Sequence, residues 1–142
     1  MSKRLGNSVD LMDIVEKQGS DAARWYFFQS QPLGPIRMTE RAIRESQQAF
    51  LIPLYNVYSF FTIYANIDGF DPVEHTVNEA NYSILDRWIR GRFEHTLAKV
   101  TDCLENYHIT ASTDVLVEFI DHLSNWYLRR SRRLSPAGKL PR

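Results

Sequence analysis

Aromatic and basic side chains gather near the C-terminal end of the sequence, in a combination suited to binding a polyanion. Trp126 and Tyr127 are followed closely by four arginines, Arg129, Arg130, Arg132 and Arg133. A guanidinium binds phosphate through a planar fork, and an aromatic ring can stack on a base. Basic residues also suit the C-terminal end of a helix, and the rings suit a core. We expect some arginines to face phosphate and both rings to be core residues, with base stacking as the alternative for Trp126.

A second candidate for phosphate chemistry is the N-terminal run Met1-Ser2-Lys3-Arg4-Leu5-Gly6-Asn7. A lysine ammonium supplies a point charge, and backbone amides beside a glycine can approach an anion closely. By itself this is a weak indication, because basic N-termini are common. We predict a loop over residues 1–9.

The sequence gives little support for nucleophilic catalysis or metal binding. Cys103 is the only cysteine, so it can form no internal disulfide, and a packed thiol is the expected role. The four histidines lack the spacing of metal ligands on a shared helix, and the Asp68 to Asp71 segment suits a turn rather than a calcium loop. The sequence therefore predicts neither a catalytic cysteine nor a metal site.

The charge is balanced overall but unevenly placed. The chain has 142 residues, with 17 basic and 17 acidic groups, and a net charge of zero argues against a nucleic-acid partner. Six of the basic groups, and no acid, lie in residues 129–142, which leaves eleven basic against 17 acidic groups elsewhere, a net charge of −6. An acidic body with a basic end indicates contact with a polyanion. A plain basic tail is the alternative.

The elements that must position these groups are all helical. Apolar residues recur every three or four positions, no stretch alternates like a strand, and each apolar stripe must be buried against another. We predict an all-α fold, an antiparallel helical bundle preceded by a short helical connector. The expected helices cover 10–17, 21–29, 39–67 with a kink or restart at Pro53, 83–107, and a last helix capped by Ser112 or Thr113 that runs into the arginines. We expect no signal peptide and no membrane span, and hence a cytoplasmic protein.

Several ordered segments together resemble class I aminoacyl-tRNA synthetases, and within them the isoleucyl-tRNA synthetases. Met1-Ser2-Lys3-Arg4 is similar to the end of the family's KMSKS signature in its KMSKR form. The other segments that resemble the family are GSDAARW (19–25), YNVYSFF (55–61), YANIDGF (64–70), LDRWI (85–89) and LSNWYLRRSRR (123–133). The resemblance spans residues 1 to about 133.

The resemblance implies a reaction and a division of the chain. The family joins an amino acid to ATP and transfers it to tRNA, so Lys3 would stabilise the departing pyrophosphate and Ser2 would help shape that loop. ATP, with Mg, would be a substrate of the parent enzyme, and no cofactor is expected in this region. The implied divisions are a catalytic-loop remnant (1–9), a helical connector (10–38), an anticodon-binding helical bundle (39–133) and a basic tail (134–142). The implied partners are tRNA(Ile), contacted by Trp126, Arg129, Arg130, Arg132 and Arg133, and the catalytic Rossmann domain of the parent chain. The alternative for some of these arginines is that they face that catalytic domain.

The sequence also departs from the family pattern. The first lysine of the signature is missing, Arg4 stands in place of its last serine, and no HIGH signature, Rossmann domain or editing domain is found. We therefore expect a piece of a larger enzyme that does not activate isoleucine alone. The alternatives are a helical protein-interaction module derived from a synthetase, or the equivalent region of a valyl- or leucyl-tRNA synthetase, against which residues 64–70 argue.

Overall fold

The computed structural model describes residues 11–31, 34–36, 38–74 and 79–134, with side chains to Ser131. The α-helices are α1 (Leu11–Gln18), α2 (Ser20–Gln29), α3 (Glu40–Ala49), α4 (Leu51–Asp68), α5 (Ile84–Glu105), α6 (Ile109–Asp121) and α7 (Arg129–Leu134). A π-helical segment, η3 (His122–Leu128), joins α6 to α7, and a short 3₁₀ turn, η2 (Glu79–Asn81), precedes α5. No strand occurs among these residues, which confirms the all-α prediction.

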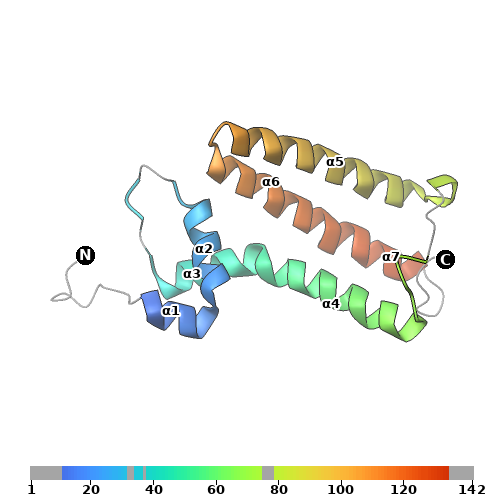
Figure 1. Ribbon diagram of the computed structural model, residues 1–142, viewed down its shortest axis with the longest axis horizontal. Coiled ribbons are helices and arrows are strands. Elements are labelled where there is room, and N and C mark those ends of the chain that lie inside the picture. The colour runs from blue at the N-terminus through green and yellow to red at the C-terminus, as the bar shows by residue number, and fades with distance from the viewer. Residues whose placement is uncertain (1–10, 32–33, 37, 75–78, 135–142) are drawn as a thin grey trace.

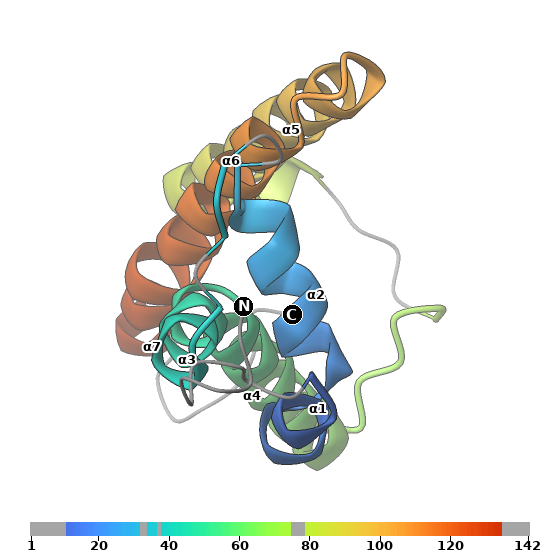
Figure 2. The ribbon, with the colours of Figure 1, turned by 90° about the vertical axis from the view of Figure 1, so that its left-hand side faces the viewer.

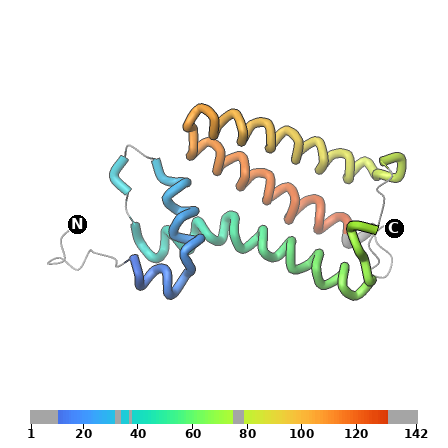
Figure 3. The backbone as a smooth tube through the Cα atoms, in the orientation of Figure 1, coloured from blue at the N-terminus to red at the C-terminus, as the bar shows by residue number. Residues whose placement is uncertain are grey.

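The three long helical segments lie side by side, with α6 between α4 and α5 (Figures 1 and 2). Figure 3 shows the path of the chain: α5 runs antiparallel to α6, whereas α4 runs in the same direction as α6. Helices α1, α2 and α3 gather at one end, where α2 also packs against α6. The opposite end holds the start of α5 together with η3 and α7, and this is the end that carries the arginines.

The most completely buried cluster of the described residues lies where the first three helices meet. Ile14 of α1 and Ile43 of α3 are fully buried, and Ala22 and Ala23 of α2 lie between them. Alanine allows close approach because its side chain is a single methyl group. The predicted division at residue 39 thus falls between helices that share a core, since α3 supplies Ile43 to it.

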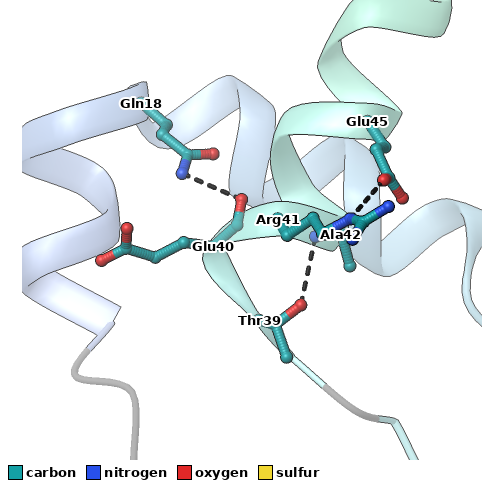
Figure 4. A network of polar contacts seen from close by, with 6 residues as sticks. All are labelled: Gln18, Thr39, Glu40, Arg41, Ala42 and Glu45. Carbon is teal, nitrogen blue, oxygen red and sulfur yellow. Dashed lines mark hydrogen bonds and ion pairs between the residues drawn. The ribbon is translucent and has the colours of Figure 1, made fainter.

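Polar contacts fix the start of α3 against α1 (Figure 4). Thr39 accepts a hydrogen bond from the Ala42 amide at 3.1 Å and so caps the N-terminus of α3. The Gln18 side chain donates to the Glu40 carbonyl at 3.1 Å, and Lys17 Nζ lies 2.8 Å from Glu40 Oε1. These contacts set the angle at which α3 leaves the cluster.

The predicted restart near Pro53 occurs, but the break lies at Phe50, where φ is −132°. Pro53 then sits in the first turn of α4, where its missing N–H has no partner to lose. Phe50 is buried and stacks on Trp25 of α2, with ring centroids 4.1 Å apart. Pro53 therefore requires a helix to start shortly before it, and the stacking of Phe50 on Trp25 accounts for the position of the break.

The predicted start of the last helix is wrong. Helix α6 begins at Ile109, so Ser112 and Thr113 lie inside it rather than capping it. Both side chains are buried, and their hydroxyls donate to the Ile109 and Thr110 carbonyls at 2.6 and 2.7 Å. Tyr107, at φ 58°, makes the left-handed turn that lets α6 start at once after α5.

The expectation that every apolar stripe would be buried is also wrong. On α5, Phe93, Leu97 and Leu104 are at least half exposed, while Thr96 and Cys103 are buried. This follows from the arrangement, because α5 packs along α6 and η3 and so has only one covered side. The burial of Cys103 confirms the expected packed thiol. Among the described residues, no helix is both long and apolar enough to cross a membrane.

Candidate functional site

The arginine cluster lies on the continuation of α6, as predicted, but a change of helix type was not foreseen. Residues His122–Leu128 form π-helix before α-helix resumes at Arg129. A π-helix has wider turns than an α-helix and is found often at functional sites. Its effect here is to shift the angular positions of Trp126 and the residues after it relative to a regular helix.

A groove opens between the start of α5 and the η3–α7 segment, and it encloses about 1280 Å³. The α5 side of this groove is apolar and aromatic, and the opposite side combines amide, aromatic and guanidinium groups. The residues that line it are Ile84, Leu85, Trp88, His122, Asn125, Trp126, Arg129 and Arg130. We call this feature the α5–η3 groove.

Two aromatic residues of the groove are held by specific ring contacts. The Arg130 guanidinium lies over the Trp126 ring, 4.3 Å from its centroid. Trp88 meets His122 edge to face, with ring centroids 5.4 Å apart. Trp126 is 49% exposed, so the expectation that it is a core residue is wrong.

Arg129 and Arg130 are exposed and have no carboxylate within ion-pair distance in the part of the chain that the structure describes. Four other arginines behave differently, because each lies beside an acid: Arg24, Arg41, Arg90 and Arg92. Both guanidinium groups at the groove therefore keep their charge uncompensated by a close acid. This is the state that phosphate binding needs.

The remaining predicted site residues are only partly described. Arg132 and Arg133 lie on α7, beyond the last described side chain. Ser2 and Lys3 lie outside the described residues, as does the predicted loop over residues 1–9. Across the described ranges, no three His, Cys, Asp or Glu side chains gather to hold a metal ion.

A hydrogen-bond network ties the two walls of the groove together. Ser83 and Asp86 form a capping box at the start of α5, in which Asp86 Oδ2 accepts from the Ser83 amide at 2.9 Å. The other oxygen of Asp86 accepts from the Tyr127 hydroxyl at 2.8 Å. Sequence reasoning missed this link, although the spacing of Ser83 and Asp86 resembles a capping box and could have indicated half of it.

The network shifts the pKa of both acids. Burial raises the pKa of Tyr127 to about 12, and its hydrogen bond to Asp86 adds to the rise. Burial alone would raise the pKa of Asp86, but hydrogen bonds from Ser83 and Tyr127 outweigh it and hold that pKa below its ordinary value. The pair is thus stable as neutral phenol and carboxylate at neutral pH.

Replacement of Tyr127 with phenylalanine is expected to reduce the free energy of unfolding by about 1 kcal/mol, because one half-buried hydrogen bond is lost. In the wild type, the contribution of the Asp86 carboxylate to the free energy of unfolding is present above the ordinary pKa of aspartate. It is lost as pH falls through the lowered pKa of Asp86. The stabilising contribution of the Tyr127 phenol is complete below the ordinary tyrosine pKa of 10.0, and it is lost as pH rises toward 12. Urea unfolding near pH 7 and near pH 3 measures this. An equal loss of stability on acidification in Y127F and wild type would contradict the link.

Comparison with known proteins agrees with the sequence resemblance. Residues 86–139 match the family model of the anticodon-binding domain of tRNA ligase. Isoleucine–tRNA ligases of Clostridium novyi and Clostridium kluyveri are 41% and 43% identical over 133 and 136 residues, in each case 93% of this chain and 13% of the relative. That of Porphyromonas gingivalis is 39% identical over 142 residues, 99% of this chain and 12% of the relative.

These matches define the class first: residues 86–139, from the first turn of α5 onward, are similar to the anticodon-binding domain of tRNA ligases. The similarity continues over nearly the whole chain, which is similar to a segment of isoleucine–tRNA ligases and spans about 13% of the length of these relatives. The predicted resemblance is thereby confirmed. The matched residues include six of the eight residues that line the α5–η3 groove, whereas Ile84 and Leu85 immediately precede the match.

Proposed function

We propose that this chain binds tRNA(Ile) as part of an isoleucine–tRNA ligase, with Arg129, Arg130, Arg132 and Arg133 contacting phosphates and Trp126 contacting the RNA beside them. The observation that carries the proposal is that Arg129 and Arg130, at the edge of an aromatic groove, have no acid at ion-pair distance among the described residues. Phosphate contacts of this kind release counterions and make affinity fall steeply with salt. Titration of the chain with tRNA(Ile), followed by electrophoretic mobility shift at increasing salt, tests it.

In the parent enzyme, we propose that ATP and isoleucine condense to an adenylate before transfer to tRNA. Lys3 would place its ammonium against the phosphate charge that develops as pyrophosphate leaves, and Ser2 would help shape the same loop. Both roles rest on the resemblance of residues 1–4 to the family signature. Mg would accompany ATP as part of the substrate.

The chain by itself is expected to give no isoleucine-dependent exchange of pyrophosphate into ATP above background. It corresponds to about 13% of the length of its relatives, and its described residues form helices without the parallel sheet of a nucleotide-binding domain. A radiolabelled exchange assay, with a full-length isoleucine–tRNA ligase as positive control, measures this. Sustained turnover by the chain alone would contradict the assignment.

Exposed apolar residues on α4 favour a second candidate function, that of a helical protein-interaction module. Tyr55, Ile63 and Ile67 are 68%, 56% and 73% exposed, and a concentrated apolar surface is typical of an interface. Sedimentation at increasing protein concentration separates the two candidates. Self-association without any tRNA binding would favour the interaction module over the RNA-binding role.

A further inference from the structure

We propose that the π-helical turn of η3, anchored by Tyr127, is a positioning element that turns Trp126 outward and holds it, together with Arg130, in place for the RNA. Tyr127 acts through its neighbour Trp126 and so is a positioning residue. This inference rests on the proposed function and adds the structural device that orients the proposed contacts. The turn lies between α6 and α7 (Figure 1).

The side chains that η3 places against the start of α5 are five positions apart. His122 meets the Trp88 ring edge to face. The Tyr127 hydroxyl reaches Asp86 at 2.8 Å. In an α-helix, residues five positions apart point in directions about 140° apart, so His122 and Tyr127 could not both face α5. In a π-helix, whose hydrogen bonds join residues five positions apart, the two side chains lie one above the other.

A regular α-helix would place Trp126, rather than Tyr127, beside the start of α5. Trp126 follows His122 by four positions, and residues four positions apart share a face of an α-helix. Tyr127 would then turn away from Asp86 and lose its hydrogen bond. In the structure Tyr127 is partly buried, whereas Trp126 is 49% exposed. The wide turn thus exchanges the places of two neighbouring rings.

The hydrogen bond between Tyr127 and Asp86 favours the wide turn over a regular helix. π-Helical segments are rare, so contacts outside the helix must stabilise this one. The acceptor is a carboxylate, and hydrogen bonds to a charged acceptor are shorter and stronger than those between neutral groups. The capping box with Ser83 fixes Asp86 at the start of α5, so this carboxylate has a set position. Loss of the Tyr127 hydroxyl should therefore let η3 return to α-helical spacing.

The outward position of Trp126 completes the pair of side chains that the proposed function uses. The Arg130 guanidinium lies 4.3 Å from the centroid of the Trp126 ring. A guanidinium that is already held in place loses less freedom when it binds a phosphate. If Trp126 moved against α5, Arg130 would lose the ring that supports it. Both contacts proposed for the RNA would then weaken together.

The test measures the exposure of Trp126 separately from RNA binding. Incorporation of 5-fluorotryptophan into the full chain gives a fluorine resonance for each of the three tryptophans, and W126F identifies that of Trp126. The change in this resonance between H₂O and D₂O reports solvent exposure. We expect a clear solvent-isotope shift in the wild type. We expect it to be largely lost in Y127F and in a variant from which Ser124 is deleted, because both changes favour α-helical spacing.

Binding of tRNA(Ile) by the same variants is the second readout, and Y127F and the Ser124 deletion should each weaken it at least about fivefold. Two matched variants should behave like the wild type in both readouts. Y58F removes a hydroxyl from an exposed tyrosine on α4. The other variant combines the Ser124 deletion with an alanine inserted after Asn125, which restores the length of η3. Circular dichroism of each variant checks that helix content is unchanged.

Three results would overturn the inference. If Trp126 is as exposed in Y127F and in the deletion variant as in the wild type, the π-helical turn does not set its position. If Trp126 becomes buried while tRNA(Ile) binds as before, the turn has no positioning role and the proposed function stands. If the wild type shows the solvent-isotope shift but binds no tRNA(Ile), the proposed function fails and the positioning role fails with it.

Discussion

Replacement of Arg129, Arg130, Arg132 and Arg133 with glutamine is expected to reduce the affinity of the chain for tRNA(Ile) by at least about tenfold at moderate salt. Each phosphate contact contributes about 0.9 to the slope of log affinity against log salt, so four lost contacts would flatten it by as much as about 3.6. The slope is more informative than the affinity at a single salt concentration, because the slope reports the number of phosphate contacts. Mobility shift or filter binding over a range of salt concentrations measures both.

The matched control removes four exposed basic residues that lie away from the arginine cluster: Arg24, Arg41, Arg44 and Lys99. This variant has the same net charge as the first one, and it loses only exposed ion pairs, which contribute little to stability. We expect it to retain most of the salt slope. Equal losses in both variants would mean that the chain responds to net charge alone, and an unchanged affinity in the first would exclude the arginine cluster as the binding site.

Replacement of Ile43 with alanine is expected to lower the free energy of unfolding by about 2–5 kcal/mol. Ile43 is fully buried in a cluster with Ile14, Ala22 and Ala23, and alanine leaves a cavity that helices joined by short turns fill poorly. The loss is large because this is the most completely buried cluster among the described residues. Urea unfolding followed by circular dichroism measures it.

Ile67→Ala supplies the control for this prediction. Ile67 lies on α4 with 73% of its surface exposed, so the same chemical change should alter stability by less than about 0.5 kcal/mol. A comparable loss in both variants would show that the α4 surface is covered in solution, which is what the interaction-module alternative requires. Similar stability of I43A and wild type would contradict the placement of the core.

Local sequence patterns predicted the helices well because their ends depend on nearby residues. Thr39 accepts the bond expected of an N-cap, and Ser83 forms one half of a capping box. Gly69 ends α4 in the left-handed conformation, at φ 61°, as its turn chemistry indicated. These features lie within a few residues of each other and can be recognised without knowledge of the packing.

Features that depend on tertiary contacts could not be predicted in this way. The apolar spacing of Phe93 and Leu97 predicted burial, but spacing does not reveal how many sides of a helix are covered. The π-helical turn shifts Trp126 out of the position that regular spacing gives it. The link from Tyr127 to Asp86 joins residues 41 positions apart, so no local pattern contains it.

The candidate site was therefore predicted in its residues but not in its shape. Arg129 and Arg130 were chosen for their charge and their place at a helix end, and the structure leaves both exposed with no close acid within the described ranges. The apolar wall formed by Ile84 and Leu85 comes from a helix far away in sequence. That wall turns a basic helix end into a groove.

The most direct test of the account is the affinity of the full chain for two hairpins taken from tRNA(Ile), the anticodon stem–loop and an acceptor-stem hairpin closed by an inert linker. Isothermal titration at one fixed salt concentration gives both affinities. We predict tighter binding of the anticodon stem–loop, because the arginine cluster lies within the residues that match an anticodon-binding domain. Equal affinity for the two hairpins, or no binding of either, would contradict the account.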